Sequence, residues 1–119
     1  MSEERIEWPA QWLRGPLPLC VLRVIAGEQP VHGYGIQRAL ETAGFGTIGG
    51  GTLYPMLGRL ERDGYVVTEW VAGGSGPARK TYAITPAGEK HLALASSLWA
   101  RFTHTTTTLM AAYQWKGQL

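Results

Sequence analysis

The hydrophobic residues of the first half of the chain recur at helical spacing. Leu17, Val21 and Ile25 follow one another every four residues, which predicts the buried stripe of a helix ended by a turn at residues 27–30. A second helix is expected over residues 33–43. It would carry four apolar residues on one face: Ile36, Ala39, Leu40 and Ala43.

A third helix is expected after the glycine-rich stretch at residues 44–51. Thr52 is suited to be its N-cap, and Pro55 would lie in the first turn, where its missing N–H does no harm. Gly64 would end the helix. Three leucines would share the buried side: Leu53, Leu57 and Leu60. The opposite side would carry Thr52, Pro55, Arg59 and Arg62, with Tyr54 on the flank.

The period then changes to that of strands. Residues 65–71 and 79–85 are rich in β-branched and aromatic residues, which predicts a hairpin with a flexible, glycine-rich tip. Thr85 and Pro86 are suited to be the N-cap and first residue of a last helix that runs to about residue 115. We refer to this hairpin as the wing and to the three helices before it as the body. We expect Trp70, Tyr82 and Ile84 to lie in the core of the wing and the body.

The order of elements, three helices, a hairpin and a long helix, predicts a mainly α fold with a small β-hairpin. It fits a winged helix-turn-helix over residues 15–85. An amphipathic segment at residues 1–14 would precede this domain, and a dimerisation helix at residues 86–119 would follow it.

Length, charge and cysteine content exclude several classes of protein. A chain of 119 residues has room for one domain, and its net charge of +2 means that any positive face must be made by the fold. Cys20 has no partner for an intramolecular disulfide, and the three histidines lack ligand spacing, so we expect no metal or cofactor. No signal peptide or membrane span is predicted, which favours the cytoplasm.

The glycine-rich stretch contains a literal G-x-G-x-x-G at Gly44, Gly46 and Gly49. A dinucleotide-binding motif needs a preceding strand and a βαβ unit, and the pattern here predicts neither. Residues 49–51 instead lead into a helix N-terminus, where free N–H groups attract phosphate. No catalytic constellation with credible spacing is present, so an enzyme is not expected.

Three motifs resemble the PadR family of bacterial transcriptional regulators: HGYGI at 32–36, GTLYPMLGRLERDGYV at 51–66 and GPARKTYAITPAG at 76–88. The resemblance implies a dimeric winged-helix repressor with a C-terminal dimerisation helix and often a small-molecule inducer. It resembles most the short subgroup with a single dimerisation helix. Thr81 stands where an aromatic is common and Ala78 where a basic residue is common, which implies a weaker grip of the wing on phosphate.

We expect the following residues to approach duplex DNA: Tyr34, Gly51, Thr52, Tyr54, Pro55, Arg59, Arg62, Arg79 and Lys80. Arg59 is the preferred base reader, because its guanidinium fork fits guanine O6 and N7. Two of these residues have alternatives: Arg62 pairing with Glu61 or Asp63, and Lys80 as a solvated charge. For Tyr34, packing on the body is favoured over contact with phosphate.

The last helix would be about 45 Å long at 1.5 Å per residue, which exceeds what a small body can cover. Its apolar stripe therefore predicts a homodimer. The expected interface or effector residues are Trp8, Trp12, Leu92, Ala95, Trp99, Phe102 and Leu109. The aromatic residues among them would either bind a flat hydrophobic effector or form interface core. The leading function is a DNA-binding repressor, and the alternative is a winged-helix module for protein interaction.

Overall fold

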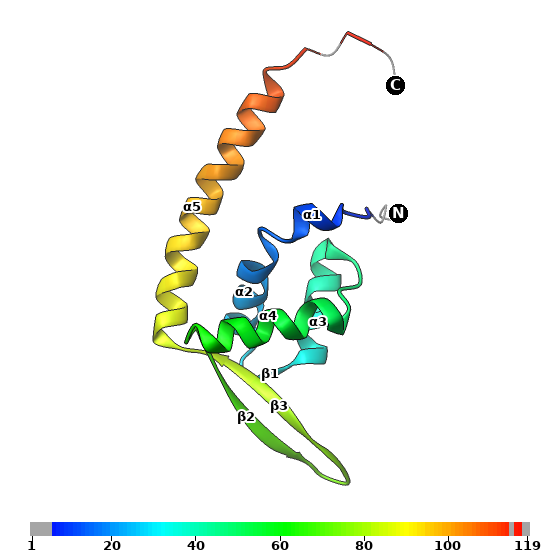
Figure 1. Cartoon of the computed structure of the whole chain (residues 1–119), viewed down its shortest axis with the longest axis vertical. Helices are drawn as coiled ribbons and strands as arrows, with labels where there is room; N and C mark the ends of the chain where they lie inside the picture. Colours follow the sequence, from blue (N-terminus) through cyan, green and yellow to red (C-terminus); the bar gives the residue numbers. More distant parts are fainter. Residues whose placement is uncertain (1–5, 115, 118–119) are drawn as a thin grey trace.

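The computed structural model describes residues 6–114 and 116–117. The order of elements, shown in Figure 1, is α1 (Ala10–Leu13), α2 (Leu17–Glu28), β1 (Val31–His32), α3 (Gly33–Leu40), a π-helical turn η1 (Glu41–Phe45), α4 (Gly50–Arg62), β2 (Val66–Gly73), β3 (Gly76–Ile84) and α5 (Pro86–Ala111). None of the described helices is long and apolar enough to cross a membrane.

Helices α2, α3 and α4 enclose the core. The buried stripes predicted from the spacing of apolar residues are confirmed for α2, with Leu17, Val21 and Ile25, and for α4, with Leu53, Leu57 and Leu60. On α3, Ile36 and Leu40 are buried and Ala39 is half-buried, but Ala43 is exposed, because the α-helix ends at Leu40 and the π-helical turn η1 follows. The sheet closes the core from the wing side with Val31, Val66, Tyr82 and Ile84. Burial of these side chains, each worth about 1.5–3 kcal/mol, fixes the orientation of α4.

Helix α4 begins earlier than the sequence predicted. The N–H groups of Thr52 and Leu53 both donate to the carbonyl of Gly49, at 3.1 and 3.0 Å, so Gly49 is the N-cap and Thr52 is not. Pro55 therefore lies inside the helix and not in its first turn. The acceptor that Pro55 leaves without an amide donor is the carbonyl of Gly51, an exposed residue near the helix end, which makes the proline tolerable.

The sheet has three antiparallel strands in the order β1-β3-β2. β1 was not predicted; it has two residues and pairs Val31 with Tyr82. The hairpin is longer than predicted, because β2 runs to Gly73 and β3 starts at Gly76, where a flexible tip was expected. Gly74 turns the chain with a φ of 63°, a conformation that glycine adopts without steric cost.

The prediction that Trp70 belongs to the core is wrong, because its side chain is 68% exposed. Tyr82 and Ile84 are buried, as predicted. Figure 1 shows the reason: the hairpin projects beyond the helical body, so its outer half has no helix to pack against.

Helix α5 starts where the sequence predicted. The hydroxyl of Thr85 accepts the N–H of Gly88 at 3.0 Å, which makes Thr85 the N-cap, and Pro86 is the first helical residue. The helix ends at Ala111, earlier than the predicted end near residue 115, and leads away from the body (Figure 1). Large apolar side chains remain exposed along it: Leu94, Leu98, Phe102, Leu109 and Met110.

Candidate nucleic-acid interface

The outward face of α4 is the one predicted from the helical wheel. Thr52, Pro55, Arg59 and Arg62 are exposed, while the leucines on the other side anchor the helix in the core. Since both arginines lie on the solvent side of a fixed helix, their guanidinium groups are available to a partner.

The amino end of α4 is bare. A methyl group placed on Gly49 or Gly51 would meet no atom within 4 Å. The first intrahelical bonds come from Thr52 and Leu53, which leaves the N–H groups of Gly50 and Gly51 directed out of the helix end. A π-helical turn, not a strand, precedes these glycines, so the fold does not supply the setting of a dinucleotide site.

Tyr54 lies over the start of α3. A Cβ atom on Gly33 would come within 2.6 Å of the Tyr54 hydroxyl, so this position has room for the ring only because it is glycine. The Tyr54 side chain is nevertheless 52% exposed. Its hydroxyl therefore lies beside the amino end of α3, on a residue that is half exposed to solvent.

The sequence favoured packing of Tyr34 on the body, and this prediction is wrong, because Tyr34 is 63% exposed. The guanidinium of Arg38 donates to the Tyr34 hydroxyl at 3.3 Å and lies 5.8 Å from the ring centroid. This hydrogen bond is the main reason why the pKa of Arg38 is raised. Arg38 was not selected from the sequence, although its position one helical turn after Tyr34 was the signal.

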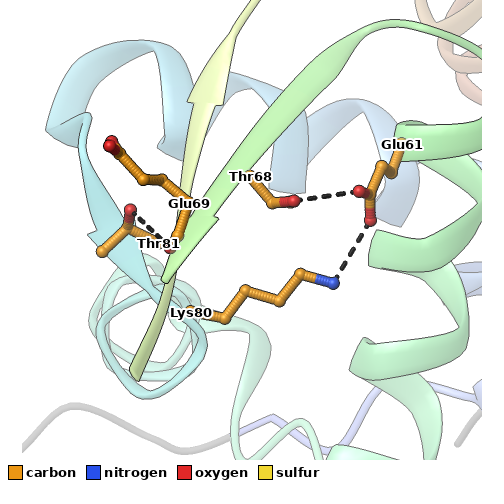
Figure 2. Close-up of polar contacts among 5 residues, drawn as sticks. All are labelled: Glu61, Thr68, Glu69, Lys80 and Thr81. Atoms are coloured by element: carbon orange, nitrogen blue, oxygen red, sulfur yellow. Dashed lines mark hydrogen bonds and ion pairs between the residues drawn. The ribbon is translucent and has the colours of Figure 1, made fainter. Parts of the chain in front are cut away.

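Lys80 is held in a corner between α4 and the wing (Figure 2). Its ammonium nitrogen is 3.3 Å from the Glu61 carboxylate, and the Thr68 hydroxyl donates to the other Glu61 oxygen at 2.9 Å. Lys80 is thus neither a solvated charge nor a free cation. The hydrogen bond from Thr68 and then the ammonium of Lys80 lower the pKa of Glu61.

The other basic residues near this corner are unpaired within the described ranges, 6–114 and 116–117, where Lys80–Glu61 is the one ion pair. Arg62 is exposed and does not form the predicted alternative pair with Glu61 or Asp63. Arg79 is exposed on β3, opposite Val71.

Thr81, which departs from the family pattern, is buried, and its hydroxyl donates to the carbonyl of Glu69 at 3.2 Å (Figure 2). Next to it, Tyr82 is buried beneath Lys80, whose ammonium lies 5.8 Å from the ring centroid. Burial, and then the neighbouring Tyr54 and Glu61, raise the pKa of Tyr82. Thr81 and Tyr82 are therefore buried structural residues of the sheet.

A second region lies between α2 and α5. A hollow of about 340 Å³ is lined by Gly15, Pro18, Leu19, His91, Ala95, Leu98, Trp99 and Phe102. The rings of Trp99 and Phe102 are 5.4 Å apart, and that of Trp99 packs against Gly15. Three of the predicted interface residues therefore lie together here: Ala95, Trp99 and Phe102.

The remaining predicted interface residues lie elsewhere in the chain. The indole N–H of Trp8 donates to the carbonyl of Gly44 at 3.0 Å, so Trp8 packs on the segment before α4. Trp12 is exposed on α1, and Leu109 is exposed near the end of α5. Leu92 packs against the core of the same chain. A single chain does not bring Trp8 together with Trp99.

The described part of the chain contains no group of three or more His, Cys, Asp or Glu placed to hold a metal ion. Cys20 is a free, partly buried thiol, and burial raises its pKa.

The chain is similar to known proteins in sequence and in fold. The transcriptional regulator PadR-like family matches residues 21–94. The transcriptional regulator Rv3488 of Mycobacterium tuberculosis is 42% identical over 67 residues, which are 56% of this chain and 61% of that protein. The chain thus spans about three fifths of that relative's length.

Solved structures agree over a longer span. A PadR family transcriptional regulator from Eggerthella lenta is 31% identical, with a TM-score of 0.77 over 87% of this chain and 88% of that one. A PadR-like regulator from Bacillus cereus is also 31% identical, with a TM-score of 0.76 over 87% of this chain and 100% of the relative. Since the family match covers more than half of the sequence and the fold is shared, the chain belongs to the PadR-like family of transcriptional regulators.

Proposed function

We propose that the chain binds double-stranded operator DNA as a homodimer and represses transcription. The observation that carries the proposal is the outward face of α4, on which Thr52, Pro55, Arg59 and Arg62 are exposed while buried leucines hold the helix in place. A recognition helix of a helix-turn-helix protein presents such an exposed face to the major groove.

Within this face, Arg59 is the base reader and the amino end of α4 contacts phosphate. A guanidinium fork matches O6 and N7 of guanine. The N–H groups of Gly50 and Gly51 and the Tyr54 hydroxyl are suited to phosphate oxygens, because the helix end is bare and positive. Arg79 would contact the backbone from the wing.

The apolar stripe of α5 supports the dimer. Leu94, Leu98 and Phe102 are exposed in the single chain, and a second copy would remove them from water. The hollow lined by Trp99 and Phe102 would then admit a flat hydrophobic effector that shifts the spacing of the two recognition helices. Titration of planar aromatic compounds, followed by tryptophan fluorescence and DNA affinity, tests this part; no change in either would contradict it.

The experiment for DNA binding begins by selecting a duplex from a randomised pool with the wild-type protein. Arg59→Ala is expected to weaken binding to that duplex by about 1–3 kcal/mol and to relax the preference at the base pair it reads. Arg101→Ala, an exposed arginine in the distal half of α5, is the matched control and should leave binding unchanged.

Failure to enrich any duplex at low salt would contradict the proposal. It would favour the alternative, a winged-helix module that binds proteins and leaves these arginines in solvent.

A further inference from the structure

The corner between α4 and the wing contains charges that no DNA contact explains. Glu61 lies in the last turn of α4, on the side that faces the wing. A carboxylate there is unfavourable beside a polyanion unless it is neutralised. Its two oxygens are both engaged, one by the Thr68 hydroxyl of β2 and one by the Lys80 ammonium of β3 (Figure 2). One residue of the helix is thus tied to both strands of the hairpin.

Lys80 has little freedom to leave this corner. Its ammonium contacts Glu61 and lies 5.8 Å from the ring centroid of Tyr82, which is buried. The side chains of Lys80 and Glu61 are 34% and 39% exposed, so the pair is partly shielded from solvent and salt. Because the negative charge of Glu61 offsets the positive charge of Lys80, the pair attracts a phosphate less than a free lysine would.

We propose that Glu61 is a positioning residue for DNA reading: through Thr68 and Lys80 it fixes the wing against the recognition helix, and Lys80 is a wing anchor instead of a phosphate ligand. The inference rests on the proposed DNA binding and revises the role expected for Lys80 there. It also leaves Arg79, which is exposed on the same strand, as the phosphate contact of the wing.

The test uses the full-length protein and the double variant Glu61→Gln/Lys80→Met, which removes both charges and keeps the net charge. Binding is measured by fluorescence anisotropy over a range of salt concentrations on two duplexes, one of arbitrary sequence and one selected by the wild type. On the arbitrary duplex we expect the wild-type affinity and salt slope. On the selected duplex we expect binding roughly five- to tenfold weaker, because the wing is no longer held in place.

Two further variants complete the design. Arg79→Gln should lower the salt slope by about 0.9 per protomer, the value for one lost phosphate contact. Glu61→Gln alone keeps groups that can hydrogen-bond Thr68 and Lys80 but removes the compensating charge. Its slope should therefore rise, by up to about 0.9 per protomer. Urea unfolding checks that each variant is folded, and only a small change is expected, since an ion pair that is partly exposed contributes little to stability.

The outcomes are separable. A double variant whose slope on the arbitrary duplex falls by about 0.9 per protomer would show that Lys80 is a phosphate ligand and overturn the inference. Unchanged affinity for the selected duplex, or an unchanged slope for Glu61→Gln, would also overturn it. If the wild type binds neither duplex, the proposed function itself fails, and the inference fails with it.

Discussion

At the residue scale, the absence of a side chain at Gly33 leaves room for the ring and hydroxyl of Tyr54. The residue is buried, and an added Cβ would come within 2.6 Å of the Tyr54 hydroxyl and 2.9 Å of its ring. Because the Tyr54 ring is half exposed, it has space to move aside. A side chain at Gly33 is therefore expected to displace a candidate phosphate contact and leave the core intact.

Gly33→Ala tests this arrangement. We expect DNA binding to weaken by about 1 kcal/mol, the value of one hydrogen bond, with little change in the free energy of unfolding. Anisotropy and urea titration measure the two quantities. Combining it with Tyr54→Phe should add no further loss in affinity; additive losses would show that Gly33 acts by another route.

Gly51 offers a complementary case at the bare end of α4. Nothing lies within 4 Å of an added Cβ there, so Gly51→Ala should raise the free energy of unfolding by about 0.5–1 kcal/mol through helix propensity. The same methyl group would obstruct the close approach of a phosphate. We expect a more stable protein that binds the selected duplex more weakly, and a variant that binds as well as the wild type would show that the backbone does not approach DNA here.

At the scale of elements, the hydroxyl of Thr85 connects the start of α5 to the loop after α4. It accepts the N–H of Gly88 and donates to the carbonyl of Gly64 at 2.6 Å. Thr85→Ala should lower the free energy of unfolding by about 0.5–2 kcal/mol, the usual value of an N-cap. Thr85→Ser, which keeps the hydroxyl, is the control, and urea unfolding at fixed protein concentration is the measurement. Equal losses in both variants would contradict the cap.

The elements differ in how far the sequence predicted them. The helices and the hairpin were predicted because the spacing of apolar residues within each segment, such as the leucines of α4, is enough to identify the element. The family indicated by the motifs is confirmed. The predicted start of α4 was wrong because the N-cap is Gly49. Its carbonyl accepts the first helical hydrogen bonds, and glycine has no side chain that would mark a cap in the sequence. The strand β1 was missed because two residues carry no period.

The candidate site shows the same division. The exposed side of α4 was predicted because helical geometry alone separates it from the leucines. The partners of Lys80 were not, since Glu61 lies 19 positions away and the hairpin must form before the two meet. Trp70 was wrongly predicted to be buried because large aromatic side chains usually are. It is exposed because the hairpin projects into solvent beyond the helical body.

At the scale of the whole molecule, the shape is the main support for the proposed homodimer. The dimensions are 61 × 34 × 25 Å. The long axis is set by α5, which leads away from the body (Figure 1). Large apolar side chains on this helix are exposed. A helix in this situation gains most of its stability from packing, not from its own propensity. The threonines at residues 105–108 are β-branched and add to that need.

Phe102→Glu is expected to dissociate the dimer, because a carboxylate without a partner would be buried in the interface at a cost of roughly 3–5 kcal/mol. His104→Glu, on the opposite side of α5, is the control and should leave the dimer intact. Sedimentation equilibrium measures the association. Equal behaviour of the two variants would mean that the stripe containing Phe102 is not the interface.

The central claim is that two copies of α4 enter the major groove of one duplex together. Hydroxyl-radical footprinting of the wild type on the selected duplex tests it directly. We expect two protected regions related by a two-fold axis and centred about 10–10.5 base pairs apart, or a multiple of that spacing. A single protected region, or protection that the dimer-breaking Phe102→Glu variant reproduces in full, would contradict the account.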